Sequence, residues 1–160
     1  MKVLIVSDTH RNEDNLIKAL EKEANLDLLI HCGDVEGAEY EIEHYAGCKT
    51  LFVAGNNDYF SRLSRELETQ IEELRVWVTH GHNYYVNANP EYIKKEAKAR
   101  KMDVVMYGHT HRPVIEQTKD LIVINPGSLT YPRQEGRKPS FIIMELDKTG
   151  EAHFTINYME

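Results

Sequence analysis

Five short polar motifs contain most of the residues that could do chemistry in this chain of 160 residues. Each motif follows an apolar run and contains Asp, Asn or His, and four of the five also contain glycine. Carboxylates, amides and imidazoles are metal ligands, and a mixture of nitrogen and oxygen donors suits Mn, Fe, Ni or Zn better than Mg or Ca. The candidate ligands are Asp8, His10, Asp34, Asn56, His80, His109 and His111.

The number of these donors predicts two metal ions rather than one. A zinc ion uses about four protein ligands in a structural site and about three in a catalytic site. Two ions on the order of 3.5–4 Å apart can activate water and hold a phosphoryl group without a serine or cysteine nucleophile. His109 and His111 alternate along an extended segment, so both imidazoles can reach one centre. Cys32 and Cys48 match no zinc motif, and we expect both to pack as small apolar side chains.

The apolar runs before the motifs predict the strands that position these residues, because buried strands have this composition. One run, at residues 71–78, could hold one strand or two. The carboxyl ends of parallel strands form the ligand-binding edge of an α/β sheet, so we expect the motifs to meet there. The predicted strands are residues 3–6, 26–30, 50–54, 71–78 and 104–107.

Helical spacing of apolar residues predicts helices between the first strands, at residues 13–23 and 36–45. Asn12 is expected to cap the first helix, and Gly47 to end the second in a left-handed conformation. A third helix is predicted to begin at Asn89-Pro90. The resulting β-α-β-α-β order indicates right-handed crossovers and parallel strands.

The pattern changes after His111. Four further strands are predicted without helices between them, so we expect the C-terminal half to form an antiparallel sheet facing the first one. Residues 59–70 are polar and are predicted as a loop or a helix. The chain is expected to form one α/β domain, residues 1–160, with two sheets and helices outside. The later strands are residues 113–117, 121–125, 140–146 and 152–158.

The charge balance disfavours general nucleic-acid binding. The chain has 19 basic and 26 acidic residues and a formal net charge of −7, whereas affinity for phosphate backbones comes from Lys and Arg. Bound divalent cations would reverse the field inside the site, so a small phosphorylated substrate remains compatible with this acidity. We expect no membrane association, because no apolar run approaches the roughly 20 residues of a membrane span. We also expect a cytoplasmic location, because the first residues lack the features of a signal peptide.

The five motifs resemble, in order and spacing, the signature blocks of the calcineurin-like metallophosphoesterases. The chain is most similar to the small bacterial and archaeal phosphodiesterases often labelled YfcE/MJ0936-like. This resemblance spans about residues 2–133 and includes Asn125-Pro126-Gly127-Ser128. The blocks are Asp8-x-His10, Gly33-Asp34, Gly55-Asn56-x-Asp58, His80-Gly81 and Gly108-His109-x-His111.

The resemblance implies a four-layer αββα sandwich, with two facing mixed β-sheets flanked by helices, that hydrolyses a small phosphodiester. Hydroxide held between two divalent ions would attack phosphorus in line. We predict manganese as the metal, with nickel, iron or zinc as alternatives. The implied first metal site contains Asp8, His10 and His111. Asp34 would bridge the first metal to the second, and the second site would be completed by Asn56, His80 and His109. Catalytic roles are predicted for His10, Asn56, His80 and His109.

One position departs from the family pattern. Many members have a histidine directly after the asparagine of the third block, where it gives a proton to the leaving group. This chain has Asn57 there, and an amide cannot act as an acid at neutral pH. His10 or His82 could replace that acid, or a good leaving group could depart without help.

Other residues near the motifs have a functional and a structural interpretation. Asp58 is expected to brace its loop, and Ser128 to belong to a turn rather than act as a nucleophile. Arg11 and Arg133 are either phosphate contacts or solvated charges. His31 is predicted to pack at the end of its strand. Three tyrosines could support a substrate ring or simply pack: Tyr84, Tyr85 and Tyr131.

Two other classes of protein are consistent with part of the pattern. A protein-binding scaffold could use the same fold without significant catalysis, as does the retromer subunit that resembles this family. Against this alternative, a cluster of carboxylates and imidazoles that binds no metal would be costly to hold together. Metallo-β-lactamase-like enzymes expect His-x-His-x-Asp-His, whereas Arg112-Pro113 follows His111 here. Amidohydrolases need a barrel of about 250 residues, which this chain cannot form. A homo-oligomer is compatible with the sequence.

Overall fold

The first sheet combines strands from both ends of the chain. The computed structural model describes residues 1–160, and three strands at its start pair in parallel, with Val3 opposite Leu28 and Leu28 opposite Lys49. These are β1 (Lys2–Val6), β2 (Leu28–His31) and β3 (Lys49–Phe52). Two antiparallel strands complete the order β10-β9-β1-β2-β3, namely β9 (Ser140–Leu146) and β10 (Ala152–Tyr158).

The second sheet has the strand order β4-β5-β6-β8-β7. Its three central strands are parallel, and an antiparallel strand lies at each edge. Both sheets are therefore mixed. The members are β4 (Glu66–Ile71), β5 (Leu74–Thr79), β6 (Val104–Met106), β7 (Pro113–Gln117) and β8 (Ile122–Pro126).

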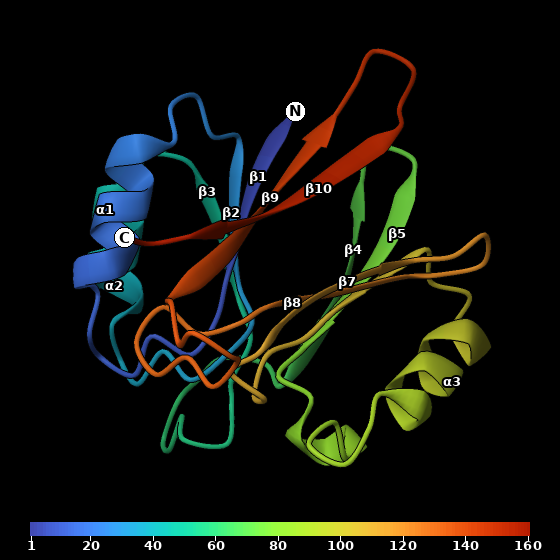
Figure 1. Ribbon diagram of the computed structural model, residues 1–160, viewed down its shortest axis with the longest axis horizontal. Coiled ribbons are helices and arrows are strands. Elements are labelled where there is room, and N and C mark those ends of the chain that lie inside the picture. The colour runs from blue at the N-terminus through green and yellow to red at the C-terminus, as the bar shows by residue number, and fades with distance from the viewer.

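Helices cover the outer faces of the two sheets. Figure 1 shows α1 (Asp14–Lys22) and α2 (Glu39–Ala46) on one outer side and α3 (Glu91–Ala99) on the other. A short 3-10 helix, η1 (His82–Tyr84), precedes α3. Gly47 ends α2 at φ 61°, which confirms the predicted left-handed cap. None of these helices has the length and apolar character needed to cross a bilayer.

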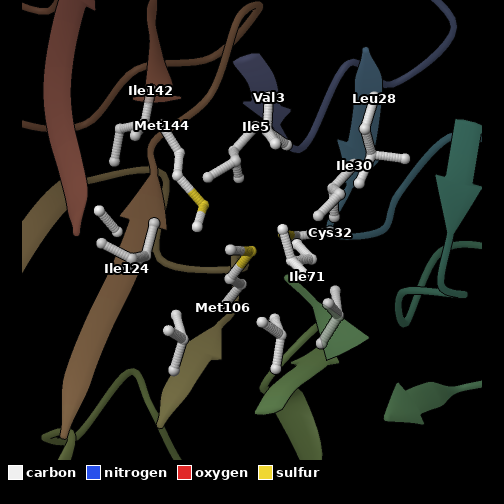
Figure 2. Packing of buried hydrophobic residues seen from close by; sticks show 14 of the residues in the cluster. Val3, Ile5, Leu28, Ile30, Cys32, Ile71, Met106, Ile124, Ile142 and Met144 are labelled. Carbon is white, nitrogen blue, oxygen red and sulfur yellow. The ribbon is translucent and has the colours of Figure 1, made fainter. Parts of the chain in front are cut away.

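Alternation along the strands explains why four layers form. In β1, Val3 and Ile5 point into the core between the sheets, while Leu4 and Val6 pack under α1 and α2. In Figure 2, Ile5 and Ile30 of the first sheet face Met106 and Ile124 of the second. Burial of each such side chain contributes about 1.5–3 kcal/mol. The observed α-β-β-α layers confirm the predicted α/β fold class.

Three expectations about the elements are wrong. The C-terminal strands do not form a sheet of their own, because β9 pairs with β1 and β8 pairs in parallel with β6. Residues 66–70, predicted as loop or helix, belong to the edge strand β4. The N-cap of α1 is Glu13 rather than Asn12, although Asn12 Oδ1 lies 3.4 Å from the backbone nitrogen of Asp14.

Candidate metal centre

The strands bring the predicted ligands to one edge of the molecule. Each ligand lies in the loop that directly follows the carboxyl end of β1, β2, β3, β5 or β6, as the apolar runs indicate. Five of the seven have positive φ angles between 49° and 68°, a conformation that residues other than glycine adopt rarely and that concentrates at functional sites. These five residues are Asp8, His10, Asp34, His109 and His111.

Two overlapping groups of donors form at this edge. In the first, Asp8, His10 and His111 offer ligand atoms within 4.8 Å of one another, and in the second Asp8, Asp34 and His80 do so. Asp8 Oδ1 lies 3.1 Å from His111 Nε2 and 3.7 Å from the Nε2 atoms of His10 and His80. Asp34 Oδ2 lies 3.7 Å from His10 Nε2 and 3.3 Å from His80 Nε2, so it also faces both groups.

Hydrogen bonds on the far side of each ring turn three imidazoles toward the centre. His80 Nδ1 donates to the Cys32 carbonyl at 2.8 Å, and His111 Nδ1 donates to the Tyr131 carbonyl at 2.7 Å. His10 Nδ1 lies 2.9 Å from Glu36 Oε2. Because a carbonyl only accepts, these bonds place the proton of neutral His80 and His111 on Nδ1 and the lone pair on Nε2. This is the arrangement by which outer residues orient metal-ligating histidines.

The Asp8 carboxylate provides a direct test of whether a cation fits. Asp8 is fully buried, and its Oδ2 accepts hydrogen bonds from Ser7 Oγ at 2.6 Å and the His109 backbone N–H at 3.0 Å. Its Oδ1 is buried without any hydrogen-bond partner. A buried carboxylate oxygen that accepts no hydrogen bond is costly. A cation beside Oδ1 would remove that cost, so the donor set fits a metal.

Asp34 is held in place by the residue that departs from the family pattern. Asn57 donates its backbone N–H to Asp34 Oδ1 and its side-chain Nδ2 to Asp34 Oδ2, both at 2.9 Å. Asp34 itself is 1% exposed. Asn57 therefore positions a carboxylate rather than supplying a proton.

His109 belongs to neither of the two groups. His109 Nδ1 is 3.3 Å from His80 Nε2, and its Nε2 is 2.9 Å from Nδ2 of Asn87. The Asn87 amide nitrogen donates to His109 Nε2 in this arrangement. Asn56 is exposed in the turn between Gly55 and Asn57.

Two glycines of the motifs are required by close approach. A Cβ atom on Gly108 would overlap Ser7 Oγ and lie 2.7 Å from Asp8 Oδ2. A Cβ on Gly55 would overlap Asp34 Oδ1 and lie 2.5 Å from the Asp34 backbone nitrogen. The chain can pass this close to both carboxylates only without side chains at these positions.

The carboxylates and imidazoles shift one another's pKa values strongly. Burial alone would raise the pKa of Asp34, but hydrogen bonding and charge from His80 outweigh it and lower that pKa to about 2. Burial would also lower the pKa of His80, but Asp8 and Asp34 raise it to about 9. Burial, reinforced by the charge of His80, lowers the pKa of His109 to about 4. Without metal, the centre thus holds anionic carboxylates that attract positive charge.

Residues outside the ligand set hold the loops together. Asp58 accepts backbone N–H donors from Asp34, Glu36 and Gly55 at 2.6–2.8 Å, which confirms its predicted bracing role. Ser128 is fully buried and its Oγ donates to the Asp8 carbonyl, so it belongs to the structure of the loop rather than to the chemistry.

His31 does more than pack at its strand end. It is fully buried; its Nδ1 accepts from the Gly33 N–H at 3.2 Å, and its Nε2 lies 3.0 Å from Thr9 Oγ1. It therefore links the loop of Asp8 to the loop of Asp34.

Sequence reasoning missed Glu36 and Asn87, the partners of His10 and His109. Glu36 stands two residues after Asp34, and a carboxylate so near a ligand was a usable signal. No pattern in the sequence marks Asn87, because its loop meets His109 only through the fold.

Comparisons with known proteins agree on one family. Residues 1–149 match the model of the calcineurin-like phosphoesterase superfamily domain. The phosphodiesterase MJ0936 of Methanocaldococcus jannaschii is 33% identical over 145 residues, which cover 79% of this chain and 83% of that protein.

Solved structures share the fold. A conserved protein of Streptococcus pneumoniae, described as a predicted phosphoesterase, superimposes with a TM-score of 0.82 at 22% identity, covering 99% of this chain and 88% of that one. Vps29 of Entamoeba histolytica in complex with Zn²⁺ has a TM-score of 0.78 at 19% identity, with 99% of both chains covered. The family match, the relative and the motif geometry together establish that this chain belongs to the calcineurin-like phosphoesterase superfamily.

Proposed function

We propose that this protein is a phosphodiesterase that works with two divalent metal ions. The observation that supports this most strongly is the pair of donor groups that share Asp8, whose Oδ1 is buried without a partner. Asp34 faces both groups, as a bridging carboxylate should. The likeness to the M. jannaschii phosphodiesterase supports the same class of reaction.

The proposed first site consists of Asp8, His10 and His111, and the second of His80, His109 and Asn56, with Asp34 between them. Bound divalent cations would supply Lewis acidity, lowering the pKa of water and neutralising charge on phosphoryl oxygens. We propose manganese, because the donors combine imidazole with carboxylate and contain no thiolate.

The side chains of this centre position the phosphoryl group rather than attack it. Neither Ser128 nor Cys32 is available as a nucleophile, since Ser128 donates to the Asp8 carbonyl and burial raises the pKa of the Cys32 thiol above the ordinary range. In this proposal the exposed Asn56 amide and the partly buried His109 ring approach the substrate from the solvent side of the centre.

The centre lacks an evident acid for the leaving group. The His82 ring lies 5.5 Å from that of His80 and 6.1 Å from that of His109, but burial, followed by the charge of His80, lowers the pKa of His82. His82 is therefore neutral at pH 7 and a poor proton donor. We expect diesters with good leaving groups to be hydrolysed fastest.

Hydrolysis of bis(p-nitrophenyl) phosphate with Mn²⁺ tests the proposal. Asp34→Asn and His109→Ala should each lower kcat/KM by at least about a hundredfold, and chelator should abolish turnover. Asp147→Asn is the matched control, because Asp147 belongs to an exposed group with Glu151 and His153 that offers a similar donor set far along the chain. This control should hydrolyse the diester at the wild-type rate.

Calorimetric titration with Mn²⁺ separates an enzyme from a protein-binding scaffold of the same fold. The proposal requires two ions per chain in the wild type and weakened binding in Asp34→Asn. Absence of metal binding together with absence of turnover would contradict it and favour the scaffold.

A further inference from the structure

A cavity of about 360 Å³ lies next to the candidate metal centre. It is bordered by the loop before α3, the end of β6 and strands β7 and β8, and we call it the arginine cavity after Arg112 and Arg133, which both line it. Asn87, which contacts His109 at 2.9 Å, and Thr110, between His109 and His111, form its border with the centre. A group bound at the metals could therefore extend into this cavity.

The walls of the arginine cavity offer apolar surface to an organic group. Val86, Val114, Val123 and the ring of Tyr107 provide apolar surface, and the volume is within the range of small-ligand sites. Tyr107 itself is only 3% exposed.

The charge of the arginine cavity is opposite to that of the chain. Arg112 and Arg133 are exposed and form no ion pair, whereas the carboxylate of Glu116 is neutralised by Lys94 at 2.7 Å. In a protein with a net charge of −7, two unpaired arginines at one cavity create a local site for an anion. Guanidinium groups match phosphate oxygens with two parallel hydrogen bonds.

The position of Arg133 ties this site to the centre. Its backbone N–H donates to the His111 carbonyl at 2.9 Å, and Arg112 directly follows His111. Both arginines also line a more open hollow of about 730 Å³ with Tyr131 and Arg137. They thus stand where a ligand leaving the metal centre meets solvent.

We infer that the arginine cavity holds one organic arm of the diester and that Arg112 and Arg133 bind a second phosphate on that arm. The preferred substrate class is therefore a phosphodiester with an additional terminal phosphate, such as a phosphorylated dinucleotide. This inference rests on the proposed function and names the substrate class of the same site.

Three dinucleotides isolate the second phosphate. d(pApA) and d(ApAp) carry a terminal phosphate at one end or the other, and d(ApA) carries only the scissile diester. With Mn²⁺, kcat/KM for at least one phosphorylated dinucleotide should exceed that for d(ApA) by about tenfold or more. Equal values for all three would overturn the inference.

Arg112→Gln and Arg133→Gln should each remove most of this preference by lowering kcat/KM for the phosphorylated dinucleotide more than kcat/KM for d(ApA). Arg62→Gln is the control, because Arg62 is an exposed arginine that lines a different cavity with Glu36 and Tyr40. A uniform loss on all three dinucleotides in the Arg133 variant would also overturn the inference, since it would mean that the arginine contacts the scissile phosphate.

Binding to chelator-treated protein tests the cavity without turnover. By calorimetry at low ionic strength, adenosine 5′-monophosphate should bind at least about tenfold more tightly than adenosine, and the doubly substituted R112Q/R133Q protein should lose this difference. Equal affinities in the wild type would contradict the inference. If bis(p-nitrophenyl) phosphate is not hydrolysed, the proposed function fails, whereas this binding result still reports on the cavity by itself.

Discussion

Asp58 offers a sharp test of how the loops hold the candidate metal ligands. Its partly buried carboxylate accepts three backbone N–H groups, with Asp34 and Gly55 on Oδ2 and Glu36 on Oδ1. These bonds fix the loop after β2 against the loop after β3. Glu36 in turn contacts His10, so removal of Asp58 should disturb both donor groups.

The size of the effect follows from the number of bonds that each substitution removes. At about 1 kcal/mol for each partly exposed hydrogen bond, Asp58→Ala should cost about 3 kcal/mol of stability. Asp58→Asn can keep its oxygen on the two N–H groups of Asp34 and Gly55, and loses only the bond from Glu36, at about 1 kcal/mol. Because the ligands lose their support, affinity for Mn²⁺ should fall by about 10- to 100-fold in the alanine variant.

Urea unfolding in the presence of chelator measures the stability change without the contribution of bound metal. The alanine variant should unfold at a midpoint about 1–2 M lower, with the asparagine variant between it and the wild type. Calorimetry with Mn²⁺ then gives the loss of affinity. A wild-type midpoint for Asp58→Ala, or equal midpoints for the two variants, would refute this reasoning.

Three further substitutions give independent predictions. Glu13 is 6% exposed, both of its carboxylate oxygens are buried without partners, and burial with nearby carboxylates raises its pKa to about 7. In the unfolded chain this carboxyl loses its proton near pH 4.5, so the free energy of unfolding falls as the pH rises from there toward 7. Measured by urea unfolding, Glu13→Gln should raise the free energy of unfolding by about 1–3 kcal/mol at pH 8 and leave it unchanged at pH 4. An equal gain at both pH values would contradict this. Gly108→Ala should lower the free energy of unfolding by about 1–3 kcal/mol and weaken Mn²⁺ binding, because the added Cβ would overlap Ser7 Oγ beside Asp8. Unchanged Mn²⁺ affinity in calorimetry would exclude that clash. Asn57→His should raise the rate for a phenyl diester relative to a p-nitrophenyl diester, and an unchanged ratio would show that the new imidazole does not protonate the leaving group.

The ligand loops could be predicted from sequence because their signals are local. An apolar run followed by Asp, Asn or His places a polar side chain at the carboxyl end of a strand, and parallel strands bring such ends together. The same local reasoning predicted Gly47 as the end of α2 and Asp58 as a brace. It could not find Asn87, whose loop contacts His109 only in the folded chain.

The distribution of strands between the sheets depends on long-range pairing. Nothing near Ser140 indicates that β9 pairs with β1, at the start of the chain, rather than with β8, the strand directly before it, because both strands are apolar. The strand β4 did carry a usable signal. Leu67, Thr69 and Ile71 alternate with polar residues, the two-residue period of a half-buried edge strand.

The central claim, a pair of metal ions shared by five loops, is tested most directly by anomalous diffraction from crystals grown with manganese. The account predicts two anomalous peaks on the order of 3.5–4 Å apart. One should lie beside Asp8, His10 and His111 and the other beside His80, His109 and Asn56, with Asp34 contacting both. A single peak, two peaks elsewhere, or no manganese among these side chains would contradict the account.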